Sequence, residues 1–352
     1  MKNKIKFLGI IALVAVIGFS MAACSDDGGS GGPGGGSGGT GGGSGGTGTG
    51  TGGGMIWRAV VDSKFGDNTI NEIAYGNNMF VAVGDYGRMV YSSDGVTWTA
   101  VADPKFGDST IFGIAYGNNK FVAVGRQSKM AYSSDGINWT AVADSTFGTT
   151  KNTIYGITYG NGKFVAVGDG SQIAYSSDGI NWTAIEDTKF GSKSRNSIIL
   201  CIAWVNNKFI AAGDFNQMVY SSDGINWTAV ADPKFGNSAI FGIAYGNNKF
   251  VIVGNSPMAY SSDGINWTAV TDTTFGVHSV RGIVYANNKF VAVGGSGANG
   301  GMMAYSSDGI NWTAVADTTF PRSDSYISGI VWANNKFVVG GAHGRIAYST
   351  GN

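Results

Sequence analysis

The sequence predicts an all-β fold, a seven-bladed β-propeller of four-stranded antiparallel blades. A Tyr-Ser pair recurs every 40 to 45 residues, and repeats of this length with several short strands are typical of propeller blades. Each repeat carries four short runs of β-forming residues, and the two ends of the chain supply complementary parts of one repeat. The repeated tyrosines are Tyr91, Tyr132, Tyr175, Tyr220, Tyr260, Tyr305 and Tyr348.

The second repeat illustrates how the strands are specified. Apolar runs rich in β-branched and aromatic residues alternate with turns of Asn, Gly, Ser and Asp, which tolerate the backbone angles of tight turns. Outside the first 23 residues, no window has the 3.6-residue apolar period of an amphipathic helix. The strands predicted in this repeat are 111–116, 121–124, 130–132 and 137–142.

The chain ends predict how the ring closes. The last repeat stops after its third strand, whereas residues 56–61 have the pattern of a fourth strand with no blade before them. If these strands pair, both termini complete the seventh blade and no long sheet edge is left exposed.

Residues 1–23 resemble a bacterial lipoprotein signal peptide. Lys2, Lys4 and Lys6 precede an apolar stretch that is short for a membrane span, and small residues follow before Cys24. The resemblance implies cleavage before Cys24 and lipid attachment to it, so that the protein is anchored to a membrane without spanning it. An ordinary secretory signal is the alternative.

The remaining chain divides into two parts. Residues 24–54 comprise the lipidated cysteine and a flexible tether of Gly, Ser and Thr, with a root-mean-square span of about 30 Å. Residues 55–352 form the propeller, expected to be monomeric. Ser25 stands where an aspartate commonly retains lipoproteins at the inner membrane, so we expect a lipid-anchored protein of the bacterial cell envelope, at the outer membrane or cell surface.

Composition excludes nucleic acid as a ligand. The chain has 23 basic and 23 acidic residues, and removal of the signal peptide leaves a slightly acidic protein without a basic run. The second cysteine, Cys201, takes a place that is glycine in five other repeats, which predicts a small buried side chain without a disulfide partner.

A Ser-x-Asp-Gly-x-x-Trp motif resembles the Asp-box of sialidase-like propellers. In that family the box is a turn between the third and fourth strands of a blade: its aspartate binds backbone amides, its aromatic residue packs into the blade, and it lies away from any active site. Here the motif is one residue shorter than the common form. The resemblance specifies fold better than function. The aspartates are Asp94, Asp135, Asp178, Asp223, Asp263 and Asp308.

Comparison of the repeats with one another locates the variable surface. The turns between first and second strands and between third and fourth strands scarcely change. The loops between second and third strands differ, as do the connections between blades, and both emerge on the face opposite the boxes. We call this surface the loop face; its loops are 85–88, 126–129, 169–172, 214–217, 255–257, 295–301 and 341–345.

Candidate ligand-binding residues follow from this comparison. Six aromatic residues fall outside the repeated positions, and four basic residues accompany them near the loop face. Exposed aromatic rings suit stacking on a sugar or capping a peptide. The alternative for Phe112, Tyr155 and Phe241 is that they plug the mouth of the central channel. The candidates are Tyr86, Arg88, Phe112, Arg126, Tyr155, Phe215, Phe241, Arg281, Tyr326 and His343.

The sequence predicts no catalytic residues, metal or cofactor. His278 and His343 lack an evident third ligand for a metal. A sialidase-like site would need an arginine cluster, a tyrosine nucleophile and an acidic residue. It would have to be assembled from Arg88, Arg126, Arg281, Arg322 and Arg345, with Tyr86 or Tyr326 and Asp85 or Asp214.

The preferred function is a non-catalytic envelope recognition module that binds a glycan or protein ligand through the loop face. The alternatives are a scaffold for an envelope assembly complex and a sialidase-like glycoside hydrolase. The family's Phe-Arg-Ile-Pro signature is absent, and near-identical blades argue against an elaborated catalytic pocket.

Overall fold

The computed structural model describes residues 20–21, 55–148, 152–191, 197–255, 258–272, 274–296, 300–321 and 325–350. The predicted signal peptide, the predicted lipid attachment site Cys24 and the predicted tether lie outside the described residues, apart from one short strand. That strand, β1 (Ser20–Met21), pairs antiparallel with β15 (Ile199–Val205) of blade 4. In the described ranges no helix is long and apolar enough to cross a membrane.

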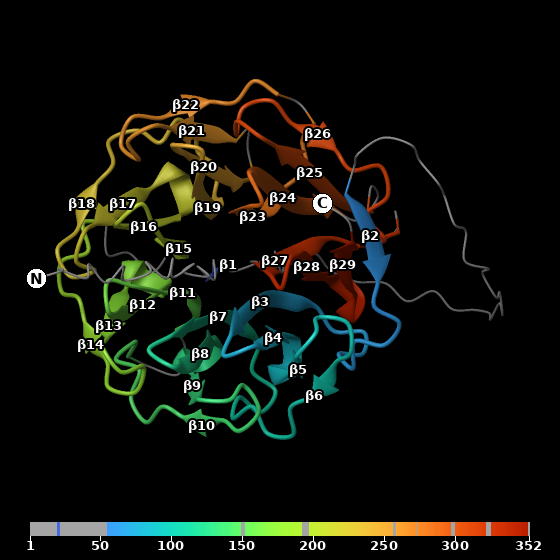
Figure 1. Cartoon of the computed structure of the whole chain (residues 1–352). Helices are drawn as coiled ribbons and strands as arrows, with labels where there is room; N and C mark the ends of the chain where they lie inside the picture. The colour runs from blue at the N-terminus through green and yellow to red at the C-terminus, as the bar shows by residue number, and fades with distance from the viewer. Residues whose placement is uncertain are drawn as a thin grey trace, which may run out of the picture.

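Seven antiparallel sheets surround a central axis, which confirms the predicted seven-bladed propeller (Figure 1). Each blade has four strands of its own, with β1 pairing beside those of blade 4, and in six blades the four strands follow in chain order from the axis outward. The innermost strands are β3 (Ile70–Gly76), β7 (Ile111–Gly117), β11 (Ile154–Gly160), β15, β19 (Ile240–Gly246), β23 (Val280–Ala286) and β27 (Ile327–Ala333).

The second and third strands form the middle of each blade. The second strands are almost entirely buried, and the third strands are buried apart from the half-buried repeated tyrosine, with Met302 and Thr350 also half-buried. The second strands are β4 (Met79–Gly84), β8 (Lys120–Gly125), β12 (Lys163–Gly168), β16 (Lys208–Gly213), β20 (Lys249–Gly254), β24 (Lys289–Ser296) and β28 (Lys336–Gly341). The third strands are β5 (Met89–Ser92), β9 (Met130–Ser133), β13 (Ile173–Ser176), β17 (Met218–Ser221), β21 (Ala259–Ser261), β25 (Gly300–Ser306) and β29 (Ile346–Thr350).

The outer strands are shorter than the sequence predicted. In blade 2 the prediction was 137–142, whereas β10 contains Thr140–Ala141 alone. The cause is the preceding turn, because Asp135 Oδ1 accepts the amides of Ile137 and Asn138 at 2.8 Å each and removes them from strand pairing. The outer strands are β6 (Thr99–Ala100), β10, β14 (Thr183–Ala184), β18 (Thr228–Ala229), β22 (Thr268–Ala269), β26 (Thr313–Ala314) and β2 (Ile56–Ala59).

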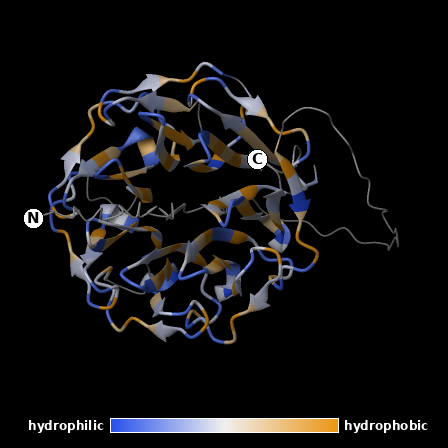
Figure 2. Cartoon of the chain, viewed as in Figure 1, coloured by the Kyte–Doolittle hydropathy of each residue, from blue (hydrophilic) through white to orange (hydrophobic). Residues whose placement is uncertain are grey.

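A repeated aromatic cluster forms the core of each blade. A tyrosine or tryptophan near the end of each innermost strand has its ring centroid 4.4–4.7 Å from that of a phenylalanine in the second strand, as for Tyr75 and Phe80. In five blades the tryptophan after the box lies 6.4–6.5 Å from the same phenylalanine, and in blade 7 Trp57 of β2 lies 6.5 Å from Phe337. Figure 2 shows many hydrophobic residues along the inner strands and paler colours on the outer strands other than β2, which is partly blue.

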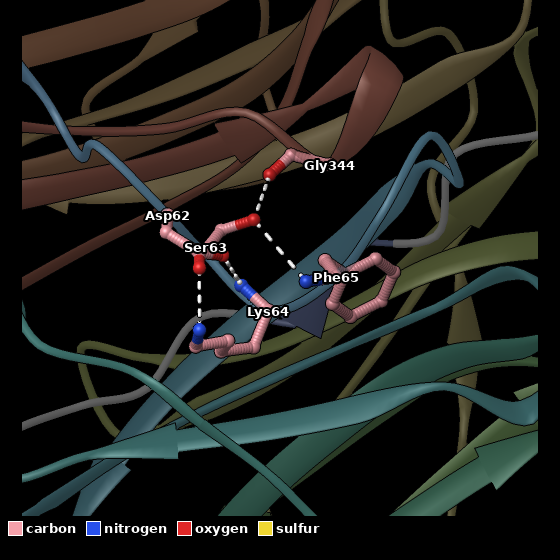
Figure 3. Close-up of polar contacts among 5 residues, drawn as sticks. All are labelled: Asp62, Ser63, Lys64, Phe65 and Gly344. Atoms are coloured by element: carbon pink, nitrogen blue, oxygen red, sulfur yellow. Dashed lines mark hydrogen bonds and ion pairs between the residues drawn. The ribbon is translucent and has the colours of Figure 1, made fainter.

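The two ends of the chain close the ring as predicted. β2 pairs antiparallel with β29, with Trp57 opposite Ser349, so both termini build blade 7. The Trp57 side chain is 7% exposed and packs against Phe337. A second link lies on the loop face, where the Ser63 hydroxyl donates to the Gly344 carbonyl oxygen (Figure 3).

The turn between the third and fourth strands is built in the same way in six blades. In blade 3, Asp178 Oδ1 accepts the Ser176 hydroxyl at 2.9 Å and the amides of Ile180 and Asn181 at 2.8 Å each. Neighbouring blades are joined on this face, since Asn118 Nδ2 donates to the Ser177 carbonyl at 3.1 Å. The repeated turns therefore hold both the blade and its contact with the preceding blade.

Cys201 is a buried free thiol, as predicted. Its side chain is 1% exposed, and its Sγ lies 3.6 Å from the carbonyl oxygens of Ala212 and Ile240. Burial raises the pKa of this thiol, so it stays protonated and acts as a small packing group.

Ring closure gives a test with a matched control. We expect Trp57→Ala to destabilise the ring by about 3–5 kcal/mol, the usual cost of removing a buried aromatic side chain. Ile56→Ala removes a side chain that is 59% exposed on the same strand and should change stability by less than about 0.5 kcal/mol. Urea unfolding followed by circular dichroism measures both. An unchanged Tm after deletion of residues 55–61 would show that the ring does not depend on β2.

The box aspartates predict how stability depends on pH. Burial alone would raise the pKa of Asp178, but hydrogen bonds from Asn181, Ile180 and Ser176 outweigh burial and hold the pKa well below its ordinary value. The fold therefore favours the charged form, whose stabilising contribution is complete above about pH 4 and is lost as the pH falls below it.

We accordingly expect the free energy of unfolding to decrease from about pH 5 to about pH 2, and less steeply in Asp178→Asn. Asp67→Asn, at an exposed aspartate for which the described residues offer no hydrogen bond, is the control and should keep the wild-type slope. Equal slopes for all three proteins in urea titrations would contradict this assignment.

Candidate functional site

The loops between second and third strands fold into short 3-10 turns on the loop face. The second residue of each of these turns has left-handed backbone angles, and the cap residue that follows returns to an extended conformation. The described turns are η1 (Asp85–Gly87), η2 (Arg126–Ser128), η3 (Asp169–Ser171), η4 (Asp214–Asn216) and η6 (Ala342–Gly344).

Large side chains occupy the left-handed position in four of these turns. Tyr86, Gln127, Phe215 and His343 have φ of 54–61°, whereas blade 3 places Gly170 there. A side chain with Cβ costs about 1–2 kcal/mol in this conformation. Tyr86 is 66% exposed and Phe215 61% exposed, so packing does not offset the cost. Backbone strain that is not offset by packing of the side chain is typical of functional positions.

Basic residues at the end of these turns hold the connections between blades. Arg88 Nη1 donates to the Phe65 carbonyl at 3.4 Å, and Lys129 Nζ donates to the Phe106 carbonyl at 2.8 Å. Arg345 donates to the Ser325 hydroxyl in the same way. The guanidinium group of Arg88, a predicted ligand-binding residue, is therefore partly engaged in shaping the loop face.

A depression of about 590 Å³ lies on the loop face between blades 1 and 2. It brings together two predicted residues, Tyr86 and Arg126, which are 40 positions apart in the sequence. The rest of its lining is polar: Asp85 on blade 1, residues 108–110 of the connection, and Gln127 and Lys129 on blade 2.

Hydrogen bonds within the depression orient its polar groups. Asn71 Nδ2 donates to Asp85 Oδ1 at 3.3 Å, and the Ser109 hydroxyl donates to Gln127 Oε1 at 2.9 Å. Lys129 Nζ donates to the same hydroxyl at 3.0 Å. Side chains fixed by such contacts lose little conformational entropy when a ligand binds.

Four predicted residues share one structural position, a β-bulge near the start of the innermost strand. Pairing with the second strand skips one residue there in every blade. The side chains at this position are hydrophobic or aromatic in blades 2 to 5 and polar in the other three. In order from blade 1 they are Asn71, Phe112, Tyr155, Leu200, Phe241, Arg281 and Ser328.

The residues at the bulge position differ in how deeply they are buried. Phe112 and Phe241 are 3% and 5% exposed, so a ligand would reach only their edges. The centroid of the Phe112 ring lies 5.3 Å from that of Tyr155 and 5.8 Å from the guanidinium carbon of Arg126. Arg126, which lines the depression, therefore contacts an aromatic residue of an innermost strand. Burial raises the pKa of nearby Asp169 despite hydrogen bonds from Thr153 and Tyr155.

The other predicted residues are distributed around the ring. The Arg281 guanidinium carbon lies 4.4 Å from the Tyr326 ring centroid, and the Tyr326 hydroxyl lies 3.3 Å from Thr69 Oγ1. Phe215 is on η4 of blade 4 and His343 on η6 of blade 7, so the structure assigns neither to the depression.

Sequence reasoning missed a buried acid. Glu72 takes the same place as Cys201, is 1% exposed, and its Oε2 accepts the Ile114 amide at 3.2 Å. The comparison of repeats that singled out Cys201 could have found Glu72. Gln127 stands in a loop that the comparison of repeats assigned to the loop face, but neither it nor Asp108, which also lines the depression, was among the candidates, because these were aromatic and basic residues.

The described arginines that a sialidase-like site would need are engaged separately. Arg88, Arg126, Arg281 and Arg345 contact four different partners, and Arg322 lies outside the described residues. In the part of the chain that the structure describes, no three His, Cys, Asp or Glu side chains gather as metal ligands.

Comparison with known proteins identifies a family model. The DUF6242 β-propeller domain matches residues 40–235, more than half of the chain. A search of curated proteins found no match.

Solved structures with similar folds are also propellers. YCF48 from Cyanidioschyzon merolae is 18% identical with a TM-score of 0.63, covering 83% of this chain and 98% of its own. YCF48 bound to D1 peptide is 16% identical with a TM-score of 0.63, covering 85% and 97%. A virginiamycin B lyase from Staphylococcus aureus is 13% identical with a TM-score of 0.69, covering 84% and 99%. Similarity at these identities shows the fold alone.

At the positions with left-handed backbone angles, we expect a glycine variant to be more stable than an alanine variant. We expect Phe215→Gly to be about 1 kcal/mol more stable than Phe215→Ala, because both lose the exposed ring but only glycine relieves the backbone. Gly170→Ala is the reciprocal control: no atom would contact the added Cβ, so it should destabilise by a similar amount through strain alone. Thermal and urea unfolding measure the differences. A glycine variant no more stable than the alanine variant would contradict the strain.

Proposed function

The chain belongs to the family of the DUF6242 β-propeller domain, and from this premise we propose that it is a non-catalytic recognition module that binds a glycan or protein ligand through the loop face. The observation that supports this proposal most directly is that Tyr86 and Phe215 have exposed rings on a strained, left-handed backbone. Both rings lie on the surface where the blades differ, whereas the opposite face is built of repeated turns. A rigid aromatic side chain supplies large contact area at low entropic cost.

A peptide or protein ligand has one specific observation in its favour. YCF48, a propeller of similar fold, has been solved bound to a D1 peptide. This supports the second candidate function, a scaffold in an envelope assembly complex.

The cell-envelope setting is part of the proposal. The lipoprotein-like residues 1–23, lipid attachment at Cys24 and the Gly-rich tether would hold the ring on the outer membrane or cell surface. The hydrogen bonding of the aspartate turns supports kinship with Asp-box propellers. The separate engagement of the arginines gives a sialidase-like activity no support.

The test uses soluble residues 55–352, which contain every strand of the seven blades. We expect saturable binding in a glycan-array screen or in a pull-down from the native envelope, lost in the triple variant Tyr86→Ala, Arg126→Ala, Phe215→Ala. The matched control is Ile137→Ala, Ile225→Ala, Ile265→Ala, which removes three exposed side chains from the opposite face and should retain binding.

Binding retained by the loop-face variant and lost by the isoleucine variant would place recognition on the opposite face, which carries the Asp-box turns. Absence of any partner in both screens would contradict a recognition module.

A further inference from the structure

We propose that the depression between blades 1 and 2 is a binding site for a neutral oligosaccharide. This inference deepens the proposed function and rests on it, because it names the ligand class and the part of the loop face that receives it. The depression is about 590 Å³, within the roughly 300–1,000 Å³ of small-molecule sites.

The charges of the lining argue for an uncharged ligand. Asp85 and Asp108 oppose Arg126 and Lys129, so the formal charges cancel. An anionic sugar would meet two carboxylates, and a cationic ligand would meet a guanidinium and an ammonium group. A polyhydroxyl ligand avoids both costs, since hydroxyl groups donate to carboxylates and accept from the basic groups.

Tyr86 provides the surface on which a sugar ring could lie. Its side chain is 66% exposed at the edge of the depression, held there by a left-handed backbone. The apolar face of a pyranose packs on an aromatic ring, while the hydroxyls at its edge need hydrogen-bonding partners. Tyr86 is the single aromatic residue of the lining, and polar side chains surround it.

The polar groups are arranged to meet such hydroxyls. Asn71 orients the Asp85 carboxylate, and Ser109 occupies the amide oxygen of Gln127, which leaves the Gln127 NH₂ as a donor toward the ligand. Asp108 is exposed and makes no hydrogen bond within the described residues. A carboxylate can accept from two adjacent hydroxyls at once, which is the pattern that a sugar presents.

A peptide is less suited to this depression. Peptide recognition commonly uses an apolar pocket for an anchor residue or a long free strand edge. The lining has no aliphatic side chain, and the outer strands of blades 1 and 2 contain two residues each.

The experiment measures binding of neutral hexasaccharides of glucose, mannose, galactose and xylose to residues 55–352 by calorimetry, with sialyllactose and hexagalacturonate as acidic probes. We expect a neutral probe to bind, Tyr86→Ala to weaken it by at least about tenfold, and Tyr86→Phe to retain it. Asp108→Ala should weaken binding of the neutral probe about three- to tenfold.

The control is Ile225→Ala, on the face that carries the Asp-box turns, which should leave binding of the neutral probe unchanged. Raising salt from about 0.05 to 0.5 M should also leave it unchanged, because no ligand charge is screened.

Three results would overturn the inference and leave the proposed function standing. An acidic probe that binds best, with affinity falling as salt rises, would refute the neutral class. A larger loss in Phe215→Ala than in Tyr86→Ala would place the site on blade 4. A protein partner that depends on the loop face, with no saccharide binding, would refute a sugar site. Failure of every glycan and protein screen would overturn both.

Discussion

Strand β2 pairs with β29 across the junction of the two chain ends, and every blade depends on this pairing for its place in the ring. Each blade contacts mainly the blade before and the blade after it, so an open ring would leave the apolar faces of blades 1 and 7 exposed. The pairing completes blade 7 with β2, whose Trp57 packs against Phe337, and the Ser63–Gly344 hydrogen bond adds a link on the loop face. Blade 1, which carries Tyr86, lies directly beside this junction.

The two faces of the ring divide structure from recognition. On the box face, hydrogen bonds such as those of Asp178 repeat from blade to blade and consume amides that would otherwise pair in the sheet. On the loop face, the side-chain hydrogen bonds of Arg88 and Lys129 to the connections between blades repeat less regularly. They leave the residues with left-handed backbone angles exposed. Because the box face carries the repeated bonds, the loop face can vary without loss of the fold.

Blade 1 departs from the repeat in its buried polar side chains. Glu72 replaces a small residue beside the axis and binds the Ile114 amide of the next blade, and Asn71 orients Asp85 in the same region. Polar groups of this kind are costly to bury unless they are hydrogen-bonded, and each of them is. Together with the exposed Tyr86 they set this sector apart from its neighbours.

The sequence by itself determined the blade count, the strand order, the closing strand at 56–61 and the face that varies, because each follows from the period of 40 to 45 residues, the incomplete repeats at the two ends and the comparison of the repeats with one another. Tertiary structure alone decided the length of the outer strands, since Asp135 takes amides that local β-propensity assigned to a strand. It also decided the burial of Phe112 and Phe241 and the meeting of Tyr86 with Arg126. These depend on the distance and angle between blades, which no local pattern encodes.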